Sequence, residues 1–289
     1  MQFHLYLPQM RLSFDRLVAS AQATESAGFT GIAGMDHMVP PAAEGHPMYE
    51  AMITNSWLAA HTRRLLVGSL VLCDAFRHPA VLAREAVSLD HASGGRFELG
   101  LGWGSWQDDF TGFGVEPATP AERVQRLRET LEVLRALWAG ETVDYDGTYH
   151  HLRGARQVPA PAGKIPVVIG GTGPKTLALV REHADWWNVP VTHLHLLDKA
   201  RDKAGDARVS VQQVVTYIHP GADRATVTQT AARRFGTMKP VTGTAAELVD
   251  HFGTLADQGI ERVYTWFSDF GQADTIAAFG KEVIEVLSR

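Results

Sequence analysis

The adjacent residues Asp36 and His37 could carry acid–base chemistry. They directly follow residues 31–35, an apolar segment with the length of a buried strand. An imidazole exchanges protons near neutral pH, so a histidine at the end of a strand can act as a general acid or base. Histidines at strand ends are also common as structural hydrogen-bonding residues. The dipeptide by itself leaves the catalytic and the structural interpretation open.

A glycine-rich loop, Gly-Gly-Thr-Gly-Pro at residues 170–174, follows an apolar segment and begins a predicted helix. Glycines let backbone amides approach an anion, and a helix N-terminus offers N–H groups that have no helical partner. The predicted phosphate site consists of Gly170, Gly171, Thr172, Gly173 and Lys175. Its spacing matches neither a Walker loop nor a dinucleotide fingerprint, so a simple tight turn is the alternative.

A second glycine-rich segment, Gly-Leu-Gly-Trp-Gly at residues 100–104, precedes Asp108 and Asp109. Gly102 and its neighbours would admit a flat ring close to the backbone. A carboxylate beside such a ring could serve as an acid or a base, and Asp109 is the candidate for this role. Adjacent aspartates are also common in solvated loops and at helix starts, which is the alternative.

We predict no metal site, although the chain has 13 histidines. His150 and His151 are a bare pair, and His193 and His195 would lie on different faces of a helix. HExxH and CxxC motifs are absent from the sequence. Cys73 is the only cysteine, and we expect it to pack as a small hydrophobic side chain.

The elements that must position these residues are short apolar segments alternating with longer segments of helical periodicity, which is typical of βα units and a parallel sheet. We predict a (β/α)8 barrel formed by one domain, residues 1–289. The eight expected strands are 3–7, 31–35, 65–73, 96–100, 166–169, 186–189, 209–218 and 262–267.

Several helix ends are marked by local signals. Gly28 follows an amphipathic segment at the position where a left-handed residue would end the helix. Thr119 with Glu122, and Thr244 with Glu247, match the capping box that begins a helix. Residues 141–164 interrupt the alternation with an Asp-Gly turn and three spaced Pro and Gly residues, so we expect a hairpin and loop inserted after the fourth βα unit.

In such a barrel the loops after the strands converge on one face, where the active site lies. Asp36, His37, Gly102, Asp109 and the loop at 170–174 would then be neighbours. This placement favours a catalytic role for His37 over a purely structural one.

The combined motifs resemble the luciferase-like family of flavin- and F420-dependent oxidoreductases, and the resemblance covers nearly the whole chain. It rests on Ala-Gly-Phe-Thr-Gly at 27–31, Asp36-His37, Arg-His-Pro-Ala at 77–80, Asp-His-Ala-Ser-Gly-Gly-Arg-Phe at 90–97, Gly-Leu-Gly-Trp at 100–103, Gly170-Gly171 and Ala-Asp-Trp-Trp-Asn at 184–188.

The resemblance implies a flavin or deazaflavin ring in the mouth of the barrel, with its phosphate tail at the loop after the fifth strand. It also implies a non-prolyl cis peptide bond behind the ring, at Ser69, Leu70 and Val71. Asp36 and His37 favour coenzyme F420 over FMN, with His37 as a catalytic residue. Asp109 stands where the family commonly has Glu, which implies an acid role.

An F420 enzyme would transfer a hydride between the coenzyme and a small organic substrate. The alternatives are an FMN-dependent monooxygenase that uses reduced flavin and oxygen, and a barrel that binds the cofactor without turnover. The substrate is undefined by the sequence, because its pocket would be built from variable loops such as 40–47 and 141–164. The resemblance implies a homodimer.

Composition indicates a small-molecule enzyme. The formal net charge is −5 with interspersed charges, which does not provide the clustered Lys and Arg that nucleic acid or an anionic membrane needs. The longest apolar segments are too short to span a bilayer. The lone cysteine and the lack of a signal-peptide pattern lead us to expect a cytoplasmic protein.

Overall fold

A computed structural model describes residues 1–41, 43, 45–104, 106–116 and 118–288, and only the backbone of residues 107 and 108. Eight parallel strands close into a barrel in which each strand pairs with the next and the last pairs with the first. They are β1 (Gln2–Tyr6), β2 (Gly31–Gly34), β3 (Leu66–Ser69), β5 (Phe97–Gly102), β8 (Val167–Gly170), β9 (Trp186–Pro190), β10 (Arg208–Tyr217) and β12 (Arg262–Phe267). The predicted (β/α)8 barrel is confirmed.

Two details of the sheet differ from the expectation. The third strand is broken into β3 and β4 (Leu72–Cys73), and the Leu70–Val71 peptide bond between them is cis. This is the cis bond that the family resemblance implies. A short strand that we did not predict, β11 (Val241–Gly243), pairs with β10 beyond the end of β9.

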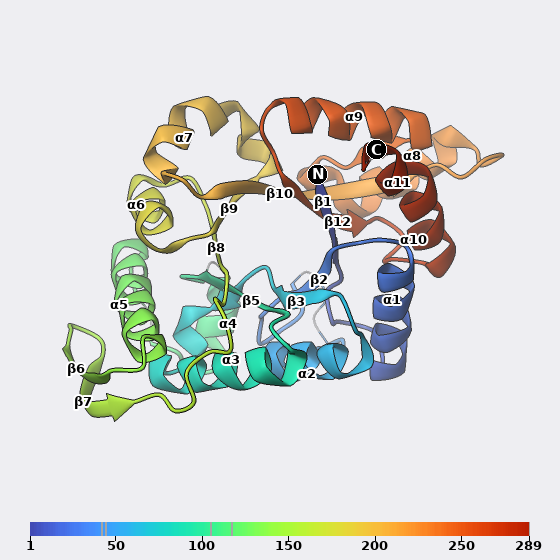
Figure 1. The fold of residues 1–289 in the computed structure, drawn as a ribbon. Coiled ribbons are helices and arrows are strands. Elements are labelled where there is room, and N and C mark those ends of the chain that lie inside the picture. The colour runs from blue at the N-terminus through green and yellow to red at the C-terminus, as the bar shows by residue number, and fades with distance from the viewer. Residues whose placement is uncertain (42, 44, 105, 117, 289) are drawn as a thin grey trace.

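The barrel is surrounded by helices (Figure 1). The longer ones are α1 (Phe14–Ser26), α2 (Ala51–His61), α3 (Pro79–Ser93), α5 (Pro120–Trp138), α6 (Pro174–His183), α7 (Leu197–Ala204), α8 (Arg224–Phe235), α9 (Ala245–Asp257) and α10 (Ala273–Phe279). Two shorter helices are α4 (Gln107–Thr111) and α11 (Glu285–Leu287). Figure 1 shows α2 and α3 on one side of the barrel and α7 and α9 on the opposite side.

The predicted helix signals are present. Gly28 follows α1 with a φ of 81°, in the left-handed region. At the start of α5, the Glu122 amide donates to the Thr119 hydroxyl (3.3 Å) and the Thr119 amide donates to the Glu122 carboxylate (2.7 Å). A capping box also begins α9 at Thr244. These local contacts satisfy amides that the helix itself leaves unpaired.

The expected insertion is a hairpin of β6 (Thr142–Asp146) and β7 (His151–Arg156), which lies between α5 and β8. The carboxylate of Glu129 on α5 accepts hydrogen bonds from the amides of Thr148, Tyr149 and His150. The hairpin is therefore attached to the barrel through its turn.

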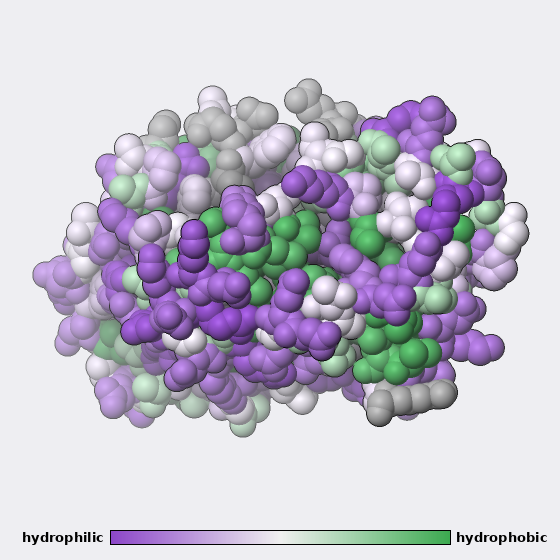
Figure 2. All heavy atoms as spheres, turned by 90° about the horizontal axis from the view of Figure 1, so that it is seen from above, coloured by the Kyte–Doolittle hydropathy of each residue, from purple (hydrophilic) through white to green (hydrophobic). Residues whose placement is uncertain are grey.

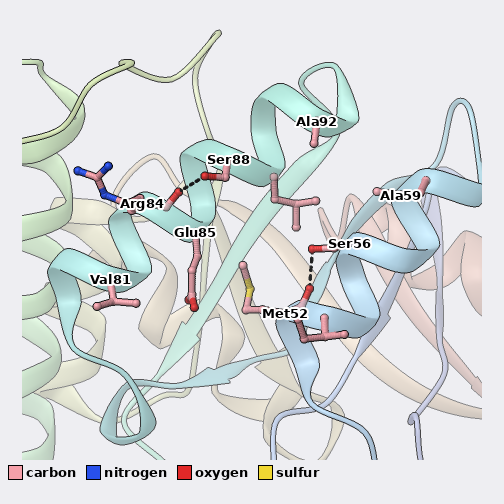
Figure 3. A pocket seen from close by; sticks show the side chains of 11 residues that line it. Met52, Ser56, Ala59, Val81, Arg84, Glu85, Ser88 and Ala92 are labelled. Carbon is pink, nitrogen blue, oxygen red and sulfur yellow. Dashed lines mark hydrogen bonds between the residues drawn. The ribbon is translucent and has the colours of Figure 1, made fainter.

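The face of the molecule formed by α7 and α9 is mostly hydrophilic (Figure 2). Seen from the side of α7 and α9, hydrophobic residues show only in separate areas between hydrophilic ones (Figure 2). An apolar groove of about 380 Å³ lies between α2 and α3, where Met52, Ser56, Glu85 and Ala92 face the gap between the two helices (Figure 3). None of the described helices has both the length and the hydropathy needed to cross a lipid bilayer.

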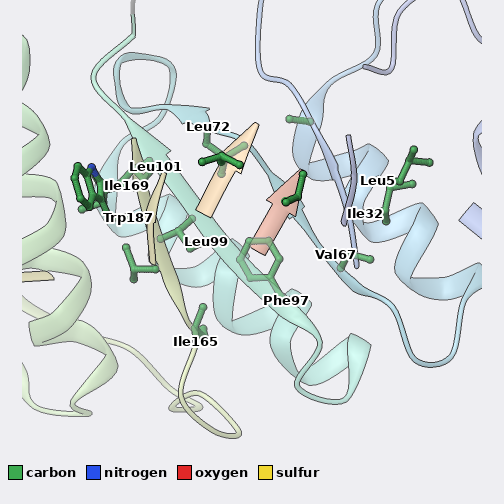
Figure 4. Packing of buried hydrophobic residues seen from close by; sticks show 14 of the residues in the cluster. Leu5, Ile32, Val67, Leu72, Phe97, Leu99, Leu101, Ile165, Ile169 and Trp187 are labelled. Carbon is green, nitrogen blue, oxygen red and sulfur yellow. The ribbon is translucent and has the colours of Figure 1, made fainter. Parts of the chain in front are cut away.

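The main hydrophobic core lies between the barrel and its helices. Alternate strand residues point outward into it, and neighbouring strands bring Leu101, Ile169 and Trp187 together (Figure 4). Burial of this layer supplies the main driving force for folding.

The intervening strand residues point into the barrel, where they are largely polar. Near its N-terminal end, Arg262 forms two hydrogen bonds with Glu98, at 2.8 and 3.0 Å, and lies over the ring of Trp186. This buried ion pair occupies the N-terminal end of the barrel interior. A site can therefore form at the C-terminal end.

Candidate active site

A cavity of about 370 Å³ lies at the C-terminal ends of the barrel strands. Residues from six consecutive strands and their loops line it, from β2 around to β10. They are Asp36, His37, Leu70, Val71, Leu72, Cys73, Gly102, Trp103, Gly104, Gly170, Gly171, Asn188, Pro190 and Gln212. The structure therefore brings together residues of three predicted groups: the acid–base dipeptide, the segment 100–104 and the glycine loop. We call this space the mouth cavity.

His37 is held by Asp109. The Nδ1 atom of His37 lies 2.6 Å from Oδ2 of Asp109, while Oδ1 of Asp109 accepts hydrogen bonds from the amides of Met38 (2.8 Å) and Val39 (3.1 Å). Asp109 is buried, whereas the His37 side chain is 24% exposed and lines the mouth cavity. The carboxylate thus contacts both the imidazole and the backbone that carries it. The side chain of Asp108 lies outside the described part of the chain.

The other half of the dipeptide, Asp36, is held by an arginine. Arg77 donates to both carboxylate oxygens of Asp36 (2.5 and 3.1 Å) and also pairs with Glu50. The amide of Cys73 donates to the same carboxylate at 2.8 Å. Asp36 lines the mouth cavity, but its oxygen atoms are engaged by protein groups. Its contacts link the loop after β2 to β4 and to the segment that precedes α3.

The broken third strand forms one wall of the cavity together with β5. Leu70 and Val71 line the cavity on either side of the cis bond, whereas the Ser69 hydroxyl lies behind it and accepts a hydrogen bond from Asn55. A Cβ atom at Gly102 would lie 2.6 Å from Val71, and one at Gly100 would lie 1.9 Å from the Ser69 carbonyl oxygen. Glycine is needed at both positions, because Gly100 lies against the Ser69 backbone and Gly102 lies against the Val71 side chain.

The glycine loop after β8 is split between the cavity and the surface. Gly170 and Gly171 line the mouth cavity, while Thr172, Gly173 and Lys175 lie outside its lining. Gly173 caps α6 without a side chain, and Pro174 occupies its first turn. The N-terminus of α6 is therefore directed toward this edge of the mouth, with Lys175 exposed beside it.

Sequence reasoning missed several lining residues, among them Asn188 and Gln212. Asn188 lies in the middle of β9 and Gln212 in the middle of β10, and the side chains of both point into the barrel. The alternation of side chains along a strand is the signal that marks such residues. Apolar content, which defines the expected strands, does not select polar residues that point inward.

The profile of the luciferase-like monooxygenase family matches residues 1–208, well over half of the chain. The chain belongs to the luciferase-like monooxygenase family. An F420-dependent glucose-6-phosphate dehydrogenase from Microbacterium testaceum is 33% identical to this luciferase-like chain over 214 residues, which are 70% of the chain and 63% of that protein. An F420-dependent hydroxymycolic acid dehydrogenase from Mycobacterium tuberculosis is 34% identical over 180 residues, 60% of the chain and 48% of that protein.

These matches span about half to two thirds of the curated relatives' own length. Solved structures extend the likeness of the fold over the whole luciferase-like chain. An F420-dependent secondary alcohol dehydrogenase, in complex with an F420-acetone adduct, superimposes with a TM-score of 0.84 at 18% identity, covering 99% and 98% of the two chains. The monooxygenase RslO1 from Streptomyces bottropensis gives 0.83 at 20% identity, with 99% of both chains covered.

Other reactive groups in this luciferase-like barrel are less suited to chemistry. Cys73 lines the mouth cavity, but burial raises the pKa of its thiol to about 12, with the carboxylates of Asp36 and Asp74 adding to the shift. A thiol with such a pKa is a poor nucleophile near neutral pH. Within the described ranges, no three His, Cys, Asp or Glu side chains gather in the way that a metal ion needs.

Proposed function

We propose that the chain is an F420-dependent oxidoreductase that transfers a hydride between coenzyme F420 and a small organic substrate. The observation that carries this proposal is the His37–Asp109 pair beside the mouth cavity. Several relatives whose names specify F420 are 33–37% identical to the chain, and this supports F420 over FMN.

The residues of the cavity fit a flat heteroaromatic cofactor. Leu70 and Val71 offer an apolar surface for one face of a ring, and Gly102 leaves the facing backbone bare. Asn188 and Gln212 supply carboxamides that can pair with ring carbonyl and imide groups. When bound, a deazaflavin supplies a carbon centre that accepts or releases a hydride.

We propose that the phosphate-bearing tail lies at the glycine loop. Gly170 and Gly171 let backbone amides come close to an anion, and the N-terminus of α6 adds a favourable dipole. Thr172, Gly173 and Lys175 would contact the tail outside the cavity. Asp36 would contribute by holding the loop rather than by touching the cofactor with its carboxylate.

The role of His37 follows from its partner. A carboxylate only accepts hydrogen bonds, so the Nδ1 atom that faces Asp109 carries the hydrogen. Nε2 of the neutral ring is then free to accept a proton from a substrate hydroxyl as the hydride leaves the adjacent carbon. Asp109 fixes the tautomer and the orientation of the ring, and it stabilises the imidazolium that forms.

Equilibrium titration with F420 and with oxidised and reduced FMN tests the cofactor. We expect saturable binding of F420 at concentrations at least tenfold lower than those needed for FMN, and unchanged F420 affinity in His37→Ala. Tighter binding of FMN would overturn the proposal in favour of a monooxygenase. Binding of F420 without hydride transfer over a panel of alcohols, aldehydes, enones and imines would favour a carrier.

We propose that the protein is a homodimer formed through the groove between α2 and α3. The exposed apolar side chains of Ile53 and Val81 line this groove, and Figure 3 shows Val81 at its edge. Arg84 and Glu85 both line it, so a twofold-related copy could pair the arginine of one chain with the glutamate of the other. Ile53→Glu should shift the mass in solution from two chains to one, whereas Val158→Glu, a change at an exposed site on the hairpin side, should not.

We further propose that residues 1–289 form one domain, because β12 near the end of the chain pairs with β1 at its start. A free cysteine is compatible with a reducing compartment, and we propose the cytoplasm as the place of action.

A further inference from the structure

An aromatic cluster lies at the part of the barrel mouth between β12 and β1. The residues that line the mouth cavity do not include this part. The rings of Tyr6 and Trp266 meet edge to face, with centroids 5.1 Å apart, and Phe235 of α8 lies 5.1 Å from Trp266 on its other side. Phe270, in the loop after β12, follows at 5.9 Å from Phe235. The cluster therefore extends from inside the barrel to the surface of the mouth.

This cluster is continuous with the mouth cavity. Leu70 lines the cavity and packs against the group of Tyr6, Met35 and Tyr264, to which Met48 and Trp266 also belong. The Tyr6 hydroxyl lies close to Gln212, another lining residue. A molecule that occupies the cavity and extends toward β1 and β12 would meet these side chains.

Part of this apolar surface is exposed. Met48 and Trp266 are partly exposed, Phe270 is 36% exposed, and Met38, next to His37, is 40% exposed. We call these four residues the apolar rim. Apolar surface at the mouth of a cavity is costly in water and becomes favourable when an apolar ligand covers it.

The charges of the cavity are unsuited to a phosphorylated ligand. None of the described residues that line it is Lys or Arg. Its one carboxylate, Asp36, is paired with Arg77, and that arginine is shared with Glu50. A phosphate group beside His37 would lose its hydration, and the described residues that line the cavity offer it no Lys or Arg in return; Arg234 lies further out, over Phe270.

We infer that the substrate is an uncharged alcohol, or the corresponding carbonyl compound, with an apolar body that the apolar rim contacts. The inference rests on the proposed function, in which His37 accepts a proton from a substrate hydroxyl as the hydride leaves the adjacent carbon. It separates this chain from relatives whose names specify glucose 6-phosphate.

The test uses 2-octanone and glucose 6-phosphate as probes, with tryptophan fluorescence of the full chain as the readout, with and without oxidised F420. Trp266 and Trp103 would report binding without turnover. We expect saturable quenching by 2-octanone and none by glucose 6-phosphate at the same concentration.

The double variant Met38→Ser with Phe270→Ser should bind 2-octanone about tenfold more weakly and F420 as before. Val286→Ser, an exposed site on α11, is the control and should behave like the wild type.

Tighter binding of glucose 6-phosphate than of 2-octanone, or equal binding of 2-octanone by the double variant and the wild type, would overturn the inference. Reduction of F420 by 2-octanol with a higher kcat/KM than by glucose 6-phosphate would support it. Failure of the proposed function gives a result distinct from failure of this inference. In that case F420 does not bind, while 2-octanone still quenches the tryptophan fluorescence of the chain without cofactor.

Discussion

The Nδ1 atom of His37 lies 2.6 Å from the Oδ2 atom of Asp109, a residue 72 positions further along the chain. The pair joins the loop after β2 to α4, and the same carboxylate accepts two amides of the β2 loop. An imidazole that is held in this way has one defined tautomer and one nitrogen left for a proton.

Asp109→Asn should lower kcat roughly 100-fold with little change in F420 affinity. Asparagine keeps an oxygen for the Met38 and Val39 amides but can present its NH2 group to Nδ1, which favours the other tautomer. The measurement is the kcat–pH profile together with F420 titration.

The control for this variant is Asp146→Asn. Asp146 also contacts a histidine, His151, but both side chains are exposed on the hairpin. This variant should have wild-type kcat. A wild-type kcat in Asp109→Asn as well would show that the His37 contact has no role in turnover.

Arg77→Met should lower the free energy of unfolding by about 3 kcal/mol, because it leaves the buried carboxylate of Asp36 without its cation. The loop that carries His37 would shift, so kcat should fall as well. Urea unfolding followed by circular dichroism gives the stability. Arg153→Met removes an exposed partner of Asp146 and should leave the midpoint unchanged. Equal midpoints for both variants would exclude a structural role for Arg77.

Gly100→Ala should lower the free energy of unfolding by about 3 kcal/mol or prevent folding. Its Cβ atom would lie 1.9 Å from the Ser69 carbonyl oxygen, and that backbone is held by β3. Gly163→Ala is the matched control, since no heavy atom lies within 4 Å of its added Cβ and its φ is outside the left-handed region. Similar thermal midpoints for the two variants would contradict the close packing of β3 against β5.

The stability of the protein should depend on His150 at acid pH. Burial lowers the pKa of His150 to about 4, below the ordinary value of 6.5. The unfolded chain therefore binds the proton more readily between pH 6.5 and pH 4, so stability is full above this window and falls as the pH decreases through it. We expect a loss of roughly 2 kcal/mol from this residue, given about 1.4 kcal/mol per pKa unit and partial screening.

His150→Gln should flatten the pH dependence, because glutamine does not titrate and can still hydrogen-bond to Thr130. Urea unfolding of both proteins at pH 7, 5.5 and 4 measures the difference. Parallel curves for the wild type and the variant would contradict the effect.

Local patterns in the sequence determined the architecture and the kind of site. Alternating strand and helix periods predict a barrel, and left-handed Gly28 and the Thr119 capping box depend on a few adjacent residues. The barrel rule places Asp36, His37 and the glycine loop on one face. These signals are reliable because each depends on contacts within a turn or a strand of the chain.

The contacts that give those residues their roles were decided by the tertiary structure. Asp109 is a partner of His37 and Asp36 is engaged by Arg77, yet each pair is separated by more than 40 positions in sequence. The aromatic cluster of Tyr6, Phe235 and Trp266 likewise forms only when β12 closes on β1. Such contacts depend on the register and closure of the barrel, which no local pattern encodes.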